Sequence, residues 1–268
     1  MRPKTKLLLR VLLPVLIVYL LLAYLILPLL WRHYEHQKKL DGLPMVTATA
    51  QGIPGDPINV ALVGSQKDVL CAMREAGWYA ADPVTWKSSI EISGSVVLDH
   101  PYPHAPVSPL YYAGRPEDLA FEKPVGTSAD RRHHVRLWQV LDNGEEGRPV
   151  WLGAATFDRG VGISHYTGAI THHIAPDIDQ ERAILENSLQ AAGMISARYQ
   201  VMGIGPTMLG RKGGGARYFT DGEVWVMRLV ENCSKTAAPP AILPSPPAVQ
   251  FKDMIWNNVA DLYRNAAK

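Results

Sequence analysis

The chain has 268 residues, of which 47% are hydrophobic and 19% are charged, and its formal net charge is +2. This composition excludes a disordered, collagenous or disulfide-dense chain, and the length suits one domain with shorter accessory segments. No block of lysine and arginine stands out as a phosphate-binding stripe, so we expect no nucleic-acid partner.

The longest uncharged segment lies near the N-terminus. Residues 11–31 carry no charge, and about 20 apolar residues in a helix span the hydrocarbon core of a bilayer. No small-residue cleavage site follows Leu30, which favours an uncleaved anchor over a cleaved signal peptide. We therefore expect a cytoplasmic tail at 1–10 and a single transmembrane helix at 11–31 in contact with the lipid bilayer.

The charges that flank this segment predict its orientation. Four basic residues and no acid precede it, whereas Glu35 and Asp41 dilute the basic residues that follow. The positive-inside rule then leaves the N-terminus in the cytoplasm and the rest of the chain on the other side. In an oxidising compartment Cys71 and Cys233 could form a disulfide, and two buried thiols are the alternative.

A polar stalk rich in glycine and proline is expected at 32–57, before a folded domain at 58–233. The domain begins with a buried strand at 58–64 and a helix at 66–76. Ser65 is the expected N-cap of this helix, and Asp68 has the spacing of a capping box. A second short helix is expected at 82–90, and four prolines predict a loop at 100–109.

Strand patterns dominate the next part of the domain. The expected strands are at 110–113, 133–141 and 150–157, followed by a hairpin around a turn at 166–168. A helix with Asp177 as its N-cap comes next, and Gly193 follows its end. Further strands are expected at 195–201 and 223–230, on either side of a glycine-rich loop at 210–215. This order predicts an α+β fold, with helices packed on a mostly antiparallel sheet.

The C-terminal region reads as a proline-rich linker at 234–250 and an amphipathic helix at 251–268. Apolar residues recur at helical spacing in this helix, and they are Phe251, Met254, Ile255, Val259 and Leu262. We favour docking of this helix on its own domain over docking on a partner or on a membrane surface.

One group of candidate site residues lies on the strand at 133–141 and just before it. Alternation along the strand places His133 among apolar side chains and places His134 with Arg132 and Arg136 on the other face. Two guanidinium groups beside an imidazole suit the binding of phosphate or carboxylate. Arg115 is a further candidate for anion binding, and a solvated strand face is the alternative.

A second group lies on the hairpin and comprises Asp158, Arg159, His165, His172 and His173. Imidazole and carboxylate ligands suit zinc or another transition metal, so His172 and His173 are candidate metal ligands. Adjacent residues of a strand point to opposite faces, however, and no HExxH, CxxC or GxSxG motif is present. The cofactor is therefore unknown. Asp177 and Asp179 are explained by the start of a helix.

Three segments carry a family resemblance: RPEDLAFEKPVG, RRHHVRLW and WLGAATFDRGVGISHYTGAITHHIAPDIDQER. Over roughly residues 60–232 the chain resembles the LssY C-terminal domain family. The resemblance implies a bacterial envelope protein of unestablished activity, whose relatives are in some cases attached to multi-pass membrane modules of the PAP2 phosphatase or DedA type. Arg159 and His165 have the spacing of the last PAP2 motif, but Asp158 and Ala169 replace residues of that motif, so we treat the match as chance.

These observations leave the question of enzymatic activity open. The first hypothesis is a periplasmic binding or accessory module at the bacterial inner membrane, which recognises an anionic lipid or glycan through Arg132, His134 and Arg136. The second is a hydrolase of phosphate esters. In it, a histidine binds metal or acts as general base, Asp158 orients it, and Arg159 or Arg136 stabilises charge. The candidate histidines are His134, His165, His172 and His173. The third is a structural partner of a multi-pass membrane protein.

Overall fold

The structure is a computed structural model in which most of the chain is described. The described residues are 3–26, 40, 42–81, 110–125, 131–144, 146–163, 168, 170–201, 208–245, 250–251, 253–257, 259–260 and 262. The helix predicted at 82–90 and the loop predicted at 100–109 lie outside them, and so does most of the turn at 166–168.

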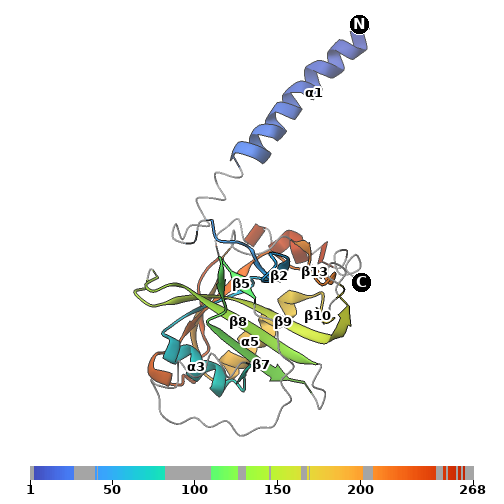
Figure 1. Ribbon diagram of the computed structural model, residues 1–268. Helices are drawn as coiled ribbons and strands as arrows, with labels where there is room; N and C mark the ends of the chain where they lie inside the picture. The colour runs from blue at the N-terminus through green and yellow to red at the C-terminus, as the bar shows by residue number, and fades with distance from the viewer. Residues whose placement is uncertain are drawn as a thin grey trace.

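The N-terminal helix differs from the expected transmembrane helix. Helix α1 covers Pro3–Leu21 and continues as a short π-helix, η1, over Leu22–Ile26 (Figure 1). The α-helix therefore starts within the basic tail and includes only about the first half of the uncharged segment. Among the described residues, no helix is both long enough and apolar enough to cross a membrane. The prediction of a single transmembrane helix at 11–31 is thus wrong.

The centre of the domain is a nine-stranded sheet in the order β15-β11-β14-β3-β9-β8-β7-β4, with β10 paired to β9. Its strands are β3 (Val60–Val63), β4 (Tyr79–Ala80), β7 (Leu119–Pro124), β8 (Arg132–Leu141), β9 (Val150–Ile163), β10 (Ile170–Ile174), β11 (Ile195–Val201), β14 (Val224–Leu229) and β15 (Ala241–Ile242). Neighbours are antiparallel except for β3 with β14 and β11 with β15. The α+β architecture with a mostly antiparallel sheet agrees with the prediction.

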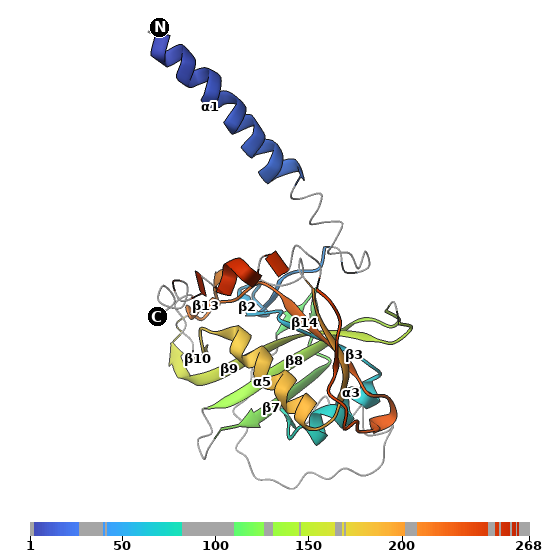
Figure 2. The ribbon, with the colours of Figure 1, turned by 180° about the vertical axis from the view of Figure 1, so that it is seen from behind.

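Two helices cover one face of this sheet (Figures 1 and 2). Helix α3 spans Gln66–Glu75, and the predicted capping box forms between Ser65 and Asp68. Helix α5 spans Ile178–Ala191, and the Asp177 carboxylate accepts a hydrogen bond from the Gln180 backbone N–H. A 3-10 turn, η3, follows β14 at Glu231–Cys233. Both helices begin where their N-cap residues predict.

Shorter strands cover part of the opposite face. A four-stranded sheet has the order β2-β1-β5-β6, and β12 pairs with β13 in a separate hairpin. These strands are β1 (Val46–Ala48), β2 (Pro54–Pro57), β5 (Tyr111–Tyr112), β6 (Arg115–Pro116), β12 (Leu209–Arg211) and β13 (Arg217–Phe219). The central strands of the main sheet are therefore buried on both faces, as the burial of all four residues of β3 shows.

The core accordingly has two layers. Trp151 and Ala155 of β9 face the helices and pack with residues such as Leu185 of α5. The alternate residues Leu152 and Ala154 belong to the second layer, beneath the four-stranded sheet. This alternation follows from the strand period of two, because both faces of the strand are covered and both carry apolar side chains.

The described residues between positions 250 and 262 are helical. Trp256 and Ala260 of this C-terminal helix are buried against Phe219 of β13, and Val259 packs beside them. This agrees with the prediction that the helix docks on its own domain.

Candidate functional site

Arg132, His134 and Arg136 share one face of β8, as the alternation predicts. Their exposed fractions are 8%, 3% and 5%, so this face is buried between the main sheet and the segments that cover it. The alternative of a solvated strand face is therefore wrong. Together with the ionisable groups that contact them, they form a buried charged layer that consists of Asp56, Glu117, Glu122, Arg132, His134, Arg136, Asp158 and Lys212.

Arg136 lies in the part of the charged layer that joins three segments of the domain. Its Nη1 donates a 2.9 Å hydrogen bond to Oδ2 of Asp56 in β2, and its Nε lies 3.4 Å from Glu117 Oε1. Lys212, after β12, places its Nζ 2.6 Å from the other oxygen of Asp56. Because desolvating a charge is costly unless it is paired, these contacts hold the covering strands on the main sheet.

Arg132 lies at the other end of the row. Its Nη1 donates a 2.8 Å hydrogen bond to Glu122 Oε2, while Asp158 Oδ2 lies 3.8 Å from its Nε, beyond hydrogen-bonding distance. The same Asp158 oxygen lies 4.0 Å from His134 Nε2. The strand register produces this grouping, since Arg132 is opposite Asp158 and His134 is opposite Glu122. Nε and Nη2 of Arg132 are buried and, within the described part of the chain, have no hydrogen-bond partner.

His133 points to the helix side of the sheet, as expected from its apolar neighbours. Its Nδ1 lies 2.6 Å from Glu181 Oε2 of α5. Its ring centroid is 5.0 Å from that of Phe157 and 6.3 Å from that of Trp78. His133 therefore links β8 to α5 and is separated from the charged layer by the sheet.

The remaining predicted site residues do not join one cluster in the described structure. Arg159 is exposed on β9. Pairing of β9 with β10 confirms the predicted hairpin and places His172 opposite Val161 and His173 opposite Gly160. His165 and the side chain of His172 lie outside the described residues, so the catalytic and metal-binding roles of the hairpin histidines stay predictions.

Arg115 lies far from Arg132 along β8. Its Nη2 donates a 2.7 Å hydrogen bond to the carbonyl oxygen of Gln139, near the other end of that strand, and its side chain is 53% exposed. The structure therefore does not bring Arg115 into the charged layer.

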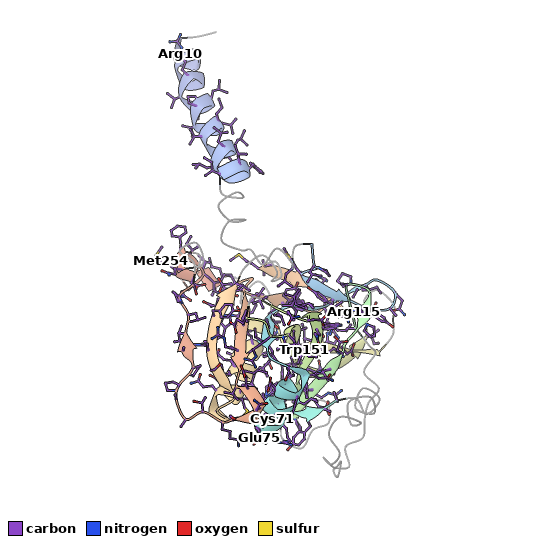
Figure 3. The ribbon with its side chains drawn as sticks, turned by 90° about the vertical axis from the view of Figure 1, so that its left-hand side faces the viewer. Arg10, Cys71, Glu75, Arg115, Trp151 and Met254 are labelled. Atoms are coloured by element: carbon purple, nitrogen blue, oxygen red, sulfur yellow. A yellow bond between two sulfur atoms is a disulfide. The ribbon has the colours of Figure 1, made fainter. Side chains whose placement is uncertain are left out.

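One group of three potential metal ligands occurs among the described residues, and it contains no histidine. It consists of Cys71, Glu75 and Cys233, whose ligand atoms lie within 4.8 Å of one another. The two cysteines form a disulfide between α3 and η3, with their Cα atoms 5.9 Å apart (Figure 3). The sulfur atoms are therefore engaged in a covalent bond in this structure.

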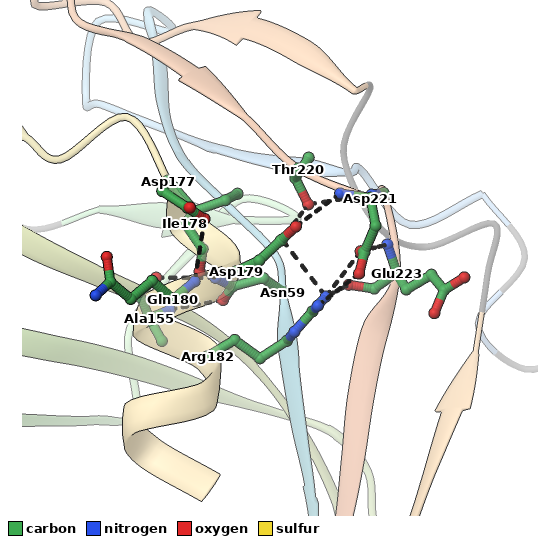
Figure 4. Close-up of polar contacts among 11 residues, drawn as sticks. Asn59, Ala155, Asp177, Ile178, Asp179, Gln180, Arg182, Thr220, Asp221 and Glu223 are labelled. Carbon is green, nitrogen blue, oxygen red and sulfur yellow. Dashed lines mark hydrogen bonds and ion pairs between the residues drawn. The ribbon is translucent and has the colours of Figure 1, made fainter. Parts of the chain in front are cut away.

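A second buried polar network lies at the start of α5 and was not expected from the sequence (Figure 4). Arg182 donates to both carboxylate oxygens of Asp221, at 2.9 and 2.6 Å, and to the backbone carbonyl of Glu223. Asp179 accepts hydrogen bonds from the Thr220 hydroxyl and the Asp221 backbone N–H, at 2.6 and 2.9 Å. Burial raises the pKa of Asp179 to about 6.

Asn59, which precedes β3, fixes the same end of α5 to the sheet. Its amide nitrogen donates to the carbonyl oxygens of Ala155 and Ile178, and its amide oxygen accepts from the Ala155 N–H. These three bonds satisfy a fully buried amide. The network thus has a structural role that needs no ligand.

The fold and the candidate site define an α+β domain whose mixed sheet carries helices on one face and a buried charged layer on the other. The sequence model of the family described as LssY C-terminus matches residues 40–224, so the chain belongs to that family. The match includes every member of the charged layer and ends at the first residue of β14. No curated protein and no solved structure is significantly similar to the chain.

Proposed function

We propose that the domain is a binding module for a small anionic group, a phosphate or carboxylate carried by a lipid or glycan, and that the group binds at Arg132. The supporting observation is the buried Nε–Nη2 edge of Arg132, which has no hydrogen-bond partner among the described residues. This edge of a guanidinium group matches an oxoanion with two parallel hydrogen bonds. Leaving such donors unbonded in the interior is costly, and a bound oxoanion removes that cost.

The carboxylates around Arg132 orient the guanidinium group. Glu122 holds Nη1 through a 2.8 Å hydrogen bond, whereas Asp158 at 3.8 Å is too far away to hydrogen-bond with Nε. An oxoanion at the Nε–Nη2 edge therefore replaces a long ionic contact of Arg132 and leaves the hydrogen bond between Arg132 and Glu122 in place. Because two carboxylates flank one guanidinium group, we expect the anion to bind together with a proton, either on the ligand or on His134.

Calorimetric titration of the full chain with inorganic phosphate tests this proposal. Arg132→Gln should weaken binding at least about tenfold, since a hydrogen bond to a charged group contributes about 1.5–3 kcal/mol. Arg115→Gln is the matched control, because it removes an exposed guanidinium group near the other end of β8, and it should bind as the unmodified chain does. Equal affinity of Arg132→Gln and the unmodified protein, with both folded by circular dichroism, would refute the proposal.

A second candidate function is hydrolysis of a phosphate ester at the same place. It is favoured by the 4.0 Å distance between His134 Nε2 and Asp158 Oδ2, beside the Arg132 guanidinium group. These groups match a general acid or base, a carboxylate that stabilises its protonated form electrostatically and a cation that stabilises developing charge. Phosphate release from p-nitrophenyl phosphate that is lost in His134→Gln would support hydrolysis. Phosphate binding without turnover would favour the binding module over the hydrolase.

We also propose that the domain functions in the periplasm. The support is the disulfide between Cys71 and Cys233, because such bonds persist in oxidising compartments and are rare in the cytosol. Thiol labelling of intact cells tests this location. The two cysteines should react with a maleimide only after reduction, and labelling without a reductant would contradict the proposal.

A further inference from the structure

Two cysteines and a glutamate meet where the end of α3 contacts η3. Cys71 and Glu75 are four residues apart in α3, so their side chains lie on the same face of the helix, one turn apart (Figure 3). Cys233 of η3 lies beside them, and one ligand atom from each of the three residues lies within 4.8 Å of the other two. Helix α3 covers the face of the main sheet opposite the charged layer, so this cluster is separate from the anion site proposed at Arg132.

Hydrogen bonds outside the cluster hold α3 and η3 in place independently of the disulfide. The backbone N–H of Asn232 in η3 donates to Oδ1 of Asp68 in α3, at 2.9 Å. Just after η3, the Thr236 N–H donates to the carbonyl oxygen of Gly193, also at 2.9 Å. Because neither bond involves sulfur, we expect the two cysteine side chains to stay close together when the disulfide is reduced.

Two cations hold the Glu75 carboxylate at the outer side of this cluster. Its Oε1 accepts a 2.9 Å hydrogen bond from Nη2 of Arg74, and its Oε2 lies 2.7 Å from Nζ of Lys235. A carboxylate has about four lone-pair sites, so Glu75 can bind a metal ion and keep both contacts. Two thiolates and a carboxylate carry more negative charge than a dication neutralises, and the two nearby cations compensate the excess.

We propose that the reduced protein binds one zinc ion through the Sγ atoms of Cys71 and Cys233 and a carboxylate oxygen of Glu75. Thiolate sulfur and carboxylate oxygen are both zinc ligands, and the thiolates disfavour hard cations such as magnesium and calcium. Two ligands one turn apart on a helix are a recurring zinc-binding arrangement. The Glu75 side chain is 24% exposed, so solvent reaches the site and water can take the fourth tetrahedral position.

The disulfide and the zinc ion exclude each other because both use the same two sulfur atoms. A dithiol reductant supplies two electrons and two protons, so that the S–S bond between Cys71 and Cys233 breaks, two thiols form and the reductant becomes a disulfide. Zinc then displaces the two thiol protons, which pass to solvent. When a disulfide oxidant takes two electrons from the thiolates and two protons from solvent, the S–S bond forms again and the zinc ion leaves unchanged.

Cobalt titration of the full chain, after reduction with a phosphine, tests the proposal. Cobalt(II) occupies zinc sites, and its bonds to thiolate give a charge-transfer absorption band that cobalt bound only to histidine or carboxylate lacks. We expect about one equivalent of cobalt to develop this band in the reduced protein, and we expect zinc to abolish it. The oxidised protein should show no such band. Zinc should also raise the melting temperature of the reduced protein and leave that of the oxidised protein unchanged.

Single substitutions test the three ligands. Cys71→Ser should lose most of the charge-transfer band, and Glu75→Gln should lower the cobalt affinity of the reduced protein severalfold. Glu146→Gln is the matched control, because Glu146 is a carboxylate of similar exposure that pairs with Arg228 elsewhere on the surface, and it should leave the affinity unchanged. A reduced protein without the band, an unchanged band in Cys71→Ser, or equal affinities of Glu75→Gln and Glu146→Gln would overturn the proposal. Zinc that stays bound after oxidation would overturn it as well.

Discussion

Asp56 and Arg136 form a 2.9 Å ion pair between two side chains that are 2% and 7% exposed. Asp56 belongs to the small sheet and Arg136 to the main sheet, so the pair joins two layers of the domain. The second Asp56 oxygen binds Lys212 beyond β12. One carboxylate thus contacts two cations, the buried Arg136 and the half-buried Lys212, from segments that are distant in sequence.

Substitution of Asp56 tests this arrangement. We expect Asp56→Asn to lower the free energy of unfolding by about 3–5 kcal/mol, because it removes the closest carboxylate from the buried Arg136 and the charged partner from Lys212. Arg74→Gln breaks the exposed pair with Glu75 and should cost less than about 1 kcal/mol. Urea denaturation of the two variants measures both values, and similar losses in both would contradict the assigned role of Asp56.

Asp179 should make the stability of the domain depend on pH. Its pKa is raised from 3.8 to about 6, mainly by burial and also by the nearby Asp221 carboxylate, while Arg182 opposes the shift. The protonated form is therefore favoured by folding, and its contribution is complete below about pH 4 and lost as the pH rises through about 6. Between about pH 4 and about pH 6, the free energy of unfolding of the native protein should fall by up to about 3 kcal/mol relative to that of Asp179→Asn.

The measurement is the free energy of unfolding of both proteins across this pH range. Asp179→Asn stays neutral, so its stability curve should be flatter between pH 4 and 6. Parallel curves would show that Asp179 titrates normally in the folded protein.

The disulfide should stabilise the domain by lowering the conformational entropy of the unfolded chain. Cys71 and Cys233 are 162 residues apart, and closing so long a loop in the unfolded state is entropically costly. Replacing both cysteines by serine should lower the stability by about 2–5 kcal/mol. A thiol reductant should lower the melting temperature of the unmodified protein and leave that of the double variant unchanged. If the reductant leaves the melting temperature of the unmodified protein unchanged, Cys71 and Cys233 are free thiols and not a disulfide.

Asp68 connects the start of α3 to two distant segments. Burial opposes its ionisation, but hydrogen bonds from Ser65, the Asn232 N–H and Arg148 outweigh this effect and lower its pKa. Its stabilising contribution is therefore present above its unfolded pKa and is lost as the pH falls through the lower folded value. Asp68→Ala should cost about 1–3 kcal/mol at neutral pH, with a smaller loss in acid. Thermal unfolding at both pH values measures the difference.

Local signals predicted the elements that local interactions determine. Ser65 and Asp177 mark the starts of α3 and α5 because their side chains bond within the first turn. Alternation along β8 identified the row of Arg132, His134 and Arg136, since it needs only the geometry of one strand.

Features that depend on distant segments were not predictable in this way. Strands of the small sheet, such as Pro54–Pro57 and Arg115–Pro116, are short and contain proline, so no strand pattern marks them. The row of Arg132, His134 and Arg136 on β8 is buried because such segments cover it, so its burial was not predictable either. Arg182 and Asp221 are 39 positions apart, and nothing in the local sequence pairs them. The transmembrane helix predicted at 11–31 is wrong for a different reason. Hydropathy identifies apolar residues, but it does not determine where the α-helix ends.

The pairing of β3 with β14 has a consequence for how the domain is made. These neighbours lie side by side near the middle of the sheet, yet they come from opposite ends of the folded region. During synthesis, β3 leaves the ribosome long before β14 exists, and the backbone N–H and C=O groups on that edge of β3 stay unpaired until nearly the whole domain has been made. The chain is therefore expected to fold late and slowly, with a long interval in which a chaperone has access to it.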